Sequence, residues 1–173
     1  MTNLSTIKQW AQREADTYRN GNSDRPLSGY VAAMSVYATA VAGMTVIGRR
    51  FGFRAPQQIT PWDVALFGIA THRVTRTITK DAVVSPVRAP FTTYDGLQGP
   101  AELHEEVRTD SHVRHAVGEL LTCPFCLAQW VATLFSAGSV FAPRAARLVA
   151  ATFASVAVSD FLQFGYSAVQ KTE

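Results

Sequence analysis

The sequence predicts an all-α membrane protein with about four transmembrane or membrane-associated helices, the last two forming a hairpin. Two runs, 29–48 and 120–142, contain no charged residue, and a third, 148–169, is interrupted only by Asp160 and Gln163. A helix of about 20 apolar residues crosses the ~30 Å hydrocarbon core of a bilayer. The runs also lack the polar stripe of a helix on the surface of a soluble protein. The alternative is a soluble helical protein with deeply buried helices.

The length fits one domain, and the composition lies between that of a soluble globule and that of a multi-pass membrane protein, so composition does not settle the class. Of the 173 residues, 47% are hydrophobic and 17% are charged, whereas soluble domains carry roughly 25% charged residues. The net charge of +3 is too diffuse to indicate nucleic-acid binding, so we expect no nucleic-acid partner. The expected partners are the lipid bilayer and either a second copy of the chain or another membrane protein.

Residues 1–28 are polar and precede the first apolar run. The stretch 5–14 fits a short helix on the membrane surface with Ile7 and Trp10 as anchors, or a solvated tail. A secretion signal would not place its apolar run behind so long a polar segment. We therefore assign 1–28 as a polar tail or interfacial helix and 29–173 as the membrane domain.

The first span is predicted over 29–48, where small residues recur at every fourth position as Ser35, Thr39 and Gly43. Small residues let two helices approach closely in lipid. We expect this face to pack against another helix.

A second, less apolar span is predicted near 62–79. Thr60 is suited to cap this helix and Pro61 to begin it. Its second half contains Arg73 and Arg76, and an arginine at the bilayer centre costs about 2.5–3.5 kcal/mol. The helix therefore either spans with its basic end at the headgroups or lies partly in the interface.

Residues 81–117 form the polar segment. The two prolines of 85–91 (SPVRAPF) predict an extended backbone, Asp95–Gly96 predicts a turn, and a charged helix is predicted over 99–120. The spans near 120–142 and 148–169 follow, joined by a short turn at 142–144, and form the hairpin.

The distribution of basic residues predicts the orientation. With four spans, the side that holds both termini and the polar segment has nine Lys and Arg residues, and the other side has five. Because positive loops stay in the cytoplasm, we expect a multi-pass protein of the bacterial inner (cytoplasmic) membrane with that side inward.

Several motifs occur together in one order: AlaThrHisArgValThrArg (70–76), LysAsp (80–81), SerProValArgAlaProPhe (85–91) and GlyGluLeuLeuThrCysProPheCysLeuAlaGlnTrpValAla (118–132). This combination resembles the bacterial small membrane proteins grouped as domain of unknown function 1360. The resemblance covers roughly residues 60–169, so the first span and the tail form an extension. It implies the membrane fold without implying an activity.

Cys123 and Cys126, the only cysteines, flank a proline where a helix is expected to begin. Serine or alanine would begin the helix equally well, so the cysteines are the unexplained part of the motif. Three interpretations remain open: apolar fillers near the membrane boundary, a redox pair, or half of a metal site. The tetrapeptide resembles the glutaredoxin active site, but the strands of that fold are missing.

A metal site would need further ligands, and zinc would be the metal. The nearby candidates are His112, His115 and Glu119. His115, Glu119 and Cys123 follow one another at four-residue steps and would share one face of a continuous helix. No cofactor is otherwise indicated.

Asp160 is an ionisable residue within a predicted span. Such a group normally faces the helix bundle and finds a partner. We expect an ion pair with Arg73 or Arg76, near His72; a proton or substrate site is the alternative. Separately, Lys80 and Arg88 are candidates for binding lipid phosphates.

No catalytic constellation stands out, so the sequence does not establish an enzyme. The leading interpretation is a non-enzymatic membrane component that packs with itself or binds a partner. The rival is a membrane-embedded thiol redox or metal-binding protein centred on Cys123 and Cys126.

Overall fold

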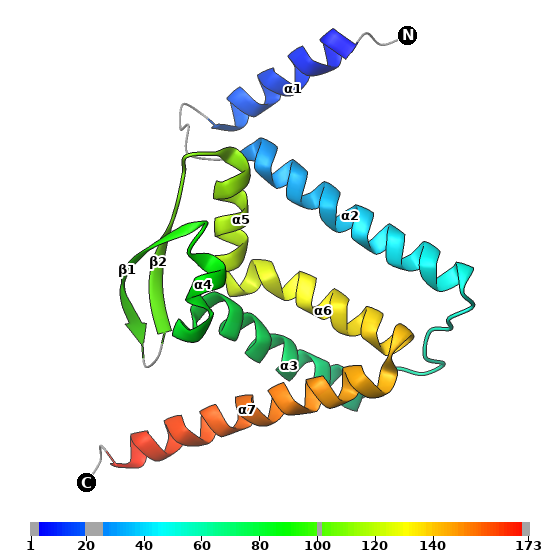
Figure 1. Ribbon diagram of the computed structural model, residues 1–173, viewed down its shortest axis with the longest axis vertical. Coiled ribbons are helices and arrows are strands. Elements are labelled where there is room, and N and C mark those ends of the chain that lie inside the picture. Colours follow the sequence, from blue (N-terminus) through cyan, green and yellow to red (C-terminus); the bar gives the residue numbers. More distant parts are fainter. Residues whose placement is uncertain (1–3, 20–25, 100–101, 171–173) are drawn as a thin grey trace.

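The chain is mostly helical, with the helices arranged side by side and one small sheet at one end of them (Figure 1). A computed structural model describes residues 4–19, 26–99 and 102–170. The elements are α1 (Leu4–Arg19), α2 (Leu27–Arg50), α3 (Pro61–Lys80), η1 (Ala82–Val84), α4 (Ser85–Arg88), β1 (Thr92–Gly99), β2 (Glu102–Val107), α5 (His112–Thr122), α6 (Pro124–Phe141) and α7 (Pro143–Gln170).

The core lies where α3, α6 and α7 pack together. Ala70, Leu127, Val131, Phe135 and Ala150 form its buried centre. The hairpin of α6 and α7 is confirmed, with Ala142 alone between the two helices. At its closed end a Cβ placed on Gly138 would lie 3.0 Å from the Cβ of Ala146, so a larger residue at 138 would push the helices apart.

The predicted start of α3 is confirmed. Thr60 Oγ1 accepts a hydrogen bond from the Asp63 backbone N–H at 3.2 Å, and Asp63 Oδ2 accepts one from the Thr60 N–H at 3.1 Å. Pro61 occupies the first turn, where its missing N–H is not needed. Further along, Thr71, Thr75 and Thr79 repeat every four residues on the buried face of α3.

The helix α2 contacts α5 and α6 near its two ends and, in its middle, through Tyr37. At its start, a Cβ on Gly29 would lie 2.2 Å from the His112 carbonyl oxygen of α5, and at its end one on Gly48 would lie 3.6 Å from the Phe141 ring of α6. Ser35 and Thr39 are exposed, and nothing lies within 4 Å of a Cβ on Gly43. Within the described chain, the small-residue face therefore does not pack against another helix.

The polar segment departs from the all-α prediction. β1 and β2 form an antiparallel ribbon in which Tyr94 pairs with Glu105, so the predicted helix over 99–120 begins only at His112. The alternation of half-buried and exposed side chains along β2 is a strand pattern. Asp95 and Gly96 lie within β1 beside an irregularity in the register, and the connection between the strands falls on residues 100–101, outside the described ones.

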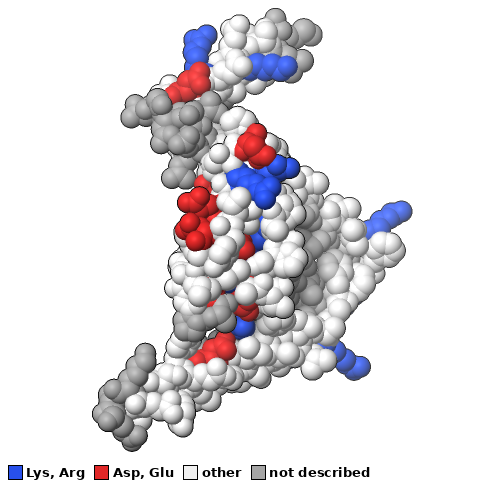
Figure 2. All heavy atoms as spheres, turned by 60° about the vertical axis from the view of Figure 1, so that its left-hand side comes forward, with Lys and Arg blue, Asp and Glu red and all other residues white. Residues whose placement is uncertain are grey.

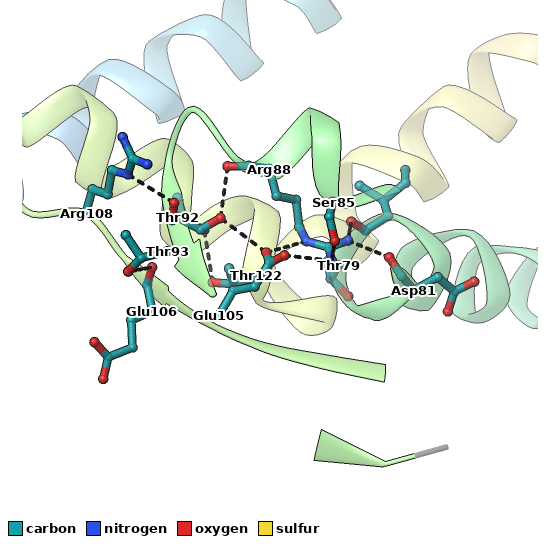
Figure 3. A network of polar contacts seen from close by, with 12 residues as sticks. Thr79, Asp81, Ser85, Arg88, Thr92, Thr93, Glu105, Glu106, Arg108 and Thr122 are labelled. Carbon is teal, nitrogen blue, oxygen red and sulfur yellow. Dashed lines mark hydrogen bonds and ion pairs between the residues drawn. The ribbon is translucent and has the colours of Figure 1, made fainter. Parts of the chain in front are cut away.

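The extended backbone predicted for 85–91 is also wrong. The chain forms one helical turn, α4, in which Pro86 lies in the first positions. A proline is tolerated there because those N–H groups have no helical acceptor. The turn brings Arg88 back beneath the end of α3, where Figure 3 shows it surrounded by polar groups.

Among the described residues, three helices are long and apolar enough to cross a membrane: α2, α6 and α7. The predicted count of four spans is therefore not confirmed. The predicted second span, α3, is not among the three because it carries four charged residues, Asp63, Arg73, Arg76 and Lys80. In Figure 2 most of the visible surface is uncharged, and acidic and basic side chains gather in patches. The tail contains a helix, α1, whose described side chains are nearly all exposed.

Candidate functional site: a cysteine pair at the corner between two helices

The two cysteines lie together where α5 ends and α6 begins. The Sγ atoms of Cys123 and Cys126 are 2.6 Å apart, and both cysteines are free. Cys123 has extended backbone angles (φ −104°, ψ 107°) and is at once the C-cap of α5 and the N-cap of α6. Its sulfur accepts a hydrogen bond from the Cys126 backbone N–H at 3.3 Å. A disulfide would need only a small side-chain movement, since its sulfurs are about 2.05 Å apart.

This corner interrupts the continuous helix that the sequence predicts through 120–142. Leu120 and Thr122 belong to α5, and Pro124 begins α6. His115 and Glu119 do share a face of α5, with Nε2 of the histidine 3.5 Å from Oε1 of the glutamate. Cys123 does not continue that face, because the helix ends there.

The metal interpretation is not supported by the arrangement of the side chains. Throughout the described residues, no group of three or more His, Cys, Asp or Glu side chains is placed to hold a metal ion. His112 lies exposed in the first turn of α5, more than two helical turns before Thr122. The proposed ligands thus form two separate pairs, Cys123–Cys126 and His115–Glu119.

Side chains from α2 complete the surroundings of the cysteine pair. The Tyr30 hydroxyl donates a hydrogen bond to Glu119 Oε2. Gln129 Nε2 donates to the Tyr37 hydroxyl at 2.9 Å, and the Tyr37 ring meets the Trp130 ring edge to face with centroids 5.1 Å apart. These α2 contacts had no local signal in the sequence, because they join residues about 90 positions apart.

A second cluster of polar groups lies at the far end of α3, around Arg73. Its Nη2 lies 2.9 Å from Asp81 Oδ2, and its Nε lies 3.1 Å from Asp160 Oδ2. The expected ion pair of Asp160 is therefore confirmed, with Arg73 as the partner. Arg76 pairs instead with Glu102 of β2, and His72 stacks on Phe161.

These groups line a groove of about 1010 Å³ between α3, η1 and α7. In it, two arginines face three carboxylates, and each carboxylate is paired with an arginine: Asp81 and Asp160 with Arg73, and Glu102 with Arg76. Opposite charges in partly exposed pairs of this kind mainly hold elements together. The groove therefore gives no support to a proton or substrate site at Asp160.

Arg88 does not face lipid. Its side chain is 0% exposed and its Nε lies 2.6 Å from Glu105 Oε2, on a side chain that is 6% exposed. All five N–H groups of the guanidinium have acceptors, a full complement for arginine: both Glu105 oxygens, the carbonyl oxygens of Ile78 and Asp81, and Ser85 Oγ (Figure 3). The lipid-phosphate assignment of Arg88 is thus wrong, whereas Lys80, half-buried in the last turn of α3, stays a prediction.

Arg88 also sets the charge state of Glu105. Burial raises the pKa of the Glu105 carboxyl, but the hydrogen bonds and positive charge of Arg88, with hydrogen bonds from Ser85 and Thr92, outweigh it and hold the pKa below its usual value. Glu105 is therefore an anion at neutral pH, and the ribbon is fastened to the end of α3 by a buried ion pair.

The comparison with protein families gives a match over residues 66–166 to the family described as Protein of unknown function (DUF1360). These residues make up more than half of the chain. The chain belongs to the DUF1360 family. Searches among curated proteins and among solved structures gave no match.

The DUF1360 region contains the cysteine pair and the ion pairs described above. It begins within α3 and ends within α7, and so includes the cysteine pair, the Arg73–Asp160 ion pair and the Arg88–Glu105 ion pair. The helices α1 and α2 precede it. Tyr30 and Tyr37 therefore reach the DUF1360 cysteine pair from an N-terminal extension.

Proposed function

We propose that this DUF1360 protein is a multi-pass protein of the cytoplasmic membrane whose Cys123–Cys126 pair cycles between dithiol and disulfide. The observation that carries the proposal is the 2.6 Å separation of the two sulfurs at the start of α6. Of the three interpretations left open by the sequence, a filler role requires no such pairing. A metal role requires ligands that the surrounding described residues do not bring together.

The position of the pair suits thiol chemistry. Cys126 is exposed, and the Cys123 sulfur accepts the Cys126 N–H at the N-terminus of α6. A thiolate is the attacking species in thiol–disulfide exchange. If the pair faces the cytoplasm, where thiols are kept reduced, its disulfide would be a transient state of a working cycle.

The placement of α3 supports four membrane crossings in this proposal. The helices α3, α6 and α7 lie alongside one another, and the C-terminal end of α3 and the N-terminal end of α6 both lie near the ribbon (Figure 1). Two arginines in the basic half of α3 have acidic partners, since Arg73 is paired with Asp81 and Asp160 and Arg76 with Glu102. Pairing of this kind lowers the cost of placing arginine in a membrane.

The experiment is a redox titration of the full-length protein in lipid nanodiscs with mixtures of reduced and oxidised glutathione. A thiolate of the pair attacks glutathione disulfide and releases one glutathione thiol; the second cysteine then displaces the other glutathione and forms the intramolecular S–S bond. Thiols are counted by the mobility shift of a maleimide reagent. We expect a single transition in which both thiols disappear together.

The variants Cys123→Ser and Cys126→Ser provide the matched controls. Each leaves one thiol that can form only a mixed disulfide with glutathione, so the concerted loss of two thiols disappears. If both thiols of the wild-type protein stay reduced in excess oxidised glutathione, the proposal is overturned.

A second candidate function is association of the protein with a second copy of itself through α2, which is the non-enzymatic role that the sequence favours. The supporting observation is the unpacked face of Ser35, Thr39 and Gly43. Disulfide crosslinking of a Thr39→Cys variant that also carries Cys123→Ser and Cys126→Ser tests it. Crosslinked dimers from Thr39→Cys and none from Thr45→Cys, at an exposed position on another face of α2, are expected, and equal crosslinking at both positions would argue against a specific face.

A further inference from the structure

A pocket of about 460 Å³ lies beside the cysteine pair, between α2, α5 and α6. Small-molecule sites usually have volumes of roughly 300–1,000 Å³ and mainly apolar walls. Cys126 itself lines this pocket, so a bound molecule would touch one of the two sulfurs. Much of the remaining wall is apolar and includes Ala33, Met34, Ala38, Leu120 and Trp130.

The side of the pocket where α2 and α6 meet carries polar groups next to flat rings. Tyr37 and Gln129 line it, and they are joined by the 2.9 Å hydrogen bond from Gln129 Nε2 to the tyrosine hydroxyl. Tyr37 is also held by Thr133, whose Oγ1 lies 2.8 Å from the same hydroxyl. A ligand ring with a carbonyl group could pack against the Trp130 ring and lie next to the Gln129 amide and the Tyr37 hydroxyl.

Glu119 supplies a group that can carry a proton. It lines the same pocket as Cys126, accepts the Tyr30 hydroxyl, and has His115 Nε2 at 3.5 Å from its Oε1. Oxidation of a dithiol releases two protons, and a carboxylate that lines the same pocket as Cys126 can take up one of them and pass it to a ligand bound there.

The surroundings of the pocket indicate where its ligand comes from. Two of its three walls are α2 and α6, both long and apolar enough to cross a membrane. Val31 and Met34, near the pocket on α2, are exposed and would face lipid in a bilayer. A ligand that enters from lipid, has a flat ring with carbonyl groups and accepts two electrons is a quinone.

We propose that this pocket binds a membrane quinone and that the quinone oxidises the Cys123–Cys126 dithiol; the inference rests on the proposed function. The S–H bonds of both cysteines break and one S–S bond forms. Two electrons and two protons pass to the quinone, whose two carbonyl oxygens become the hydroxyl groups of a hydroquinone. Glu119 accepts the Cys126 proton during this transfer.

The test uses the reduced full-length protein in lipid nanodiscs and a short-chain benzoquinone as the probe. Quinone reduction is followed by absorbance, and the remaining thiols are counted with maleimide. We expect one quinone to be reduced for each cysteine pair that is oxidised. Replacement of Glu119 by Gln should slow the reaction and change its dependence on pH.

A pair of matched substitutions on α2 tests the pocket itself. Ala33→Trp fills the pocket, and Ala40→Trp places the same ring on an exposed position outside it. Ala33→Trp should reduce the rate at low quinone concentration by about tenfold or more, equivalent to ~1.4 kcal/mol of binding free energy. Ala40→Trp should react like the wild type, and both should keep the glutathione transition. Gln129→Leu, which removes the polar wall without adding bulk, is the second variant and should also react more slowly.

The outcomes separate this inference from the proposed function. If the wild-type protein shows the glutathione transition but does not reduce the quinone, or if Ala33→Trp and Gln129→Leu react as fast as the wild type, the quinone site is wrong and the thiol chemistry stands. If the glutathione transition is itself absent, both proposals fail.

Discussion

Arg88 and Glu105 form an ion pair that is closed off from solvent, with 2.6 Å between Arg88 Nε and Glu105 Oε2. The arginine comes from the short turn after α3 and the glutamate from the middle of β2. Between them, Thr92 Oγ1 lies 3.0 Å from the Arg88 carbonyl oxygen and 3.2 Å from Glu105 Oε2. This pair therefore fastens the ribbon to the helical part of the protein from the buried side, in addition to the pair between Arg76 and Glu102.

Replacing Glu105 by Gln should destabilise the protein strongly. The glutamine keeps the shape of the side chain but leaves the buried Arg88 guanidinium without a counter-charge, which typically costs about 3–5 kcal/mol. Thermal unfolding in detergent measures the effect. Glu106→Gln, the same change at the neighbouring exposed position of β2, should leave the unfolding temperature nearly unchanged, and equal losses in the two variants would contradict a special role for Glu105.

Acid should weaken the same link. The folded-state pKa of Glu105 lies below its usual value, so the ionised carboxylate contributes stability that is complete above the unfolded pKa of about 4.3. As the pH falls below that value and through the lower folded pKa, the unfolded state takes up the proton first and the contribution is lost. Unfolding temperature measured against pH should fall less steeply in Glu105→Gln than in the wild type; parallel curves would refute this assignment.

The Arg73 cluster should tolerate the loss of one carboxylate better than the loss of the arginine. In Asp160→Asn, Arg73 keeps the two contacts to Asp81, at 2.9 and 3.4 Å. The side chains are 20% and 37% exposed, so we expect a cost of roughly 1 kcal/mol or less. Arg73→Met leaves both carboxylates without their cation and should cost more. The unfolding temperatures of the two variants test this order. A larger decrease in Asp160→Asn than in Arg73→Met would show that Asp160, and not Arg73, contributes most to the stability of the cluster.

The contact between α2 and α5 should depend on one glycine. A Cβ on Gly29 would lie 2.2 Å from the His112 carbonyl oxygen and 2.7 Å from the Ala116 Cβ, whereas one on Gly43 would meet nothing within 4 Å. Gly29→Val should therefore push α2 away and cost about 1–3 kcal/mol, with slower quinone reduction in the same protein. Gly43→Val introduces the same residue in the same helix and should preserve both the stability and the rate of quinone reduction. An equal loss of stability in Gly43→Val would show that the helix propensity of valine, and not the contact with α5, causes the effect.

Labelling of single cysteines can count the crossings. In a protein that carries Cys123→Ser and Cys126→Ser, the variants Gln57→Cys and Asp95→Cys place a thiol in the loop before α3 and in β1, both exposed. A membrane-impermeant maleimide added to intact cells should label Gln57→Cys and leave Asp95→Cys unlabelled. Labelling of neither or both positions would place the loop and the ribbon on one side and show that α3 does not cross.

The helices were predictable because their signals are local. Uncharged runs mark α2, α6 and α7, and Thr60 with Pro61 marks the start of α3. The expected pairing of Asp160 was also correct, since an ionisable group among apolar residues has few ways to be satisfied.

The ribbon and the buried arginine were missed because their cause is not local. The charged stretch 99–107 has the composition of a solvated helix. Its strand structure is linked to the buried Arg88, which needs the Glu105 carboxylate as its counter-charge. That need exists only because α4 turns the arginine inward. The inward and outward alternation of β2, with Leu103, Glu105 and Val107 on one side, was the available signal. The contacts of Tyr30 and Tyr37 had no signal in the sequence, since they depend on where α2 lies.

The break between α5 and α6 consists of one residue, Cys123. Any change in the angle between these helices must alter the backbone torsions of that residue, and with them the direction of its sulfur. Conversely, a bond between the two sulfurs would restrict those torsions. The oxidation state of the pair and the bend between the helices are therefore linked by covalent geometry, without a need for any intervening chain of side chains.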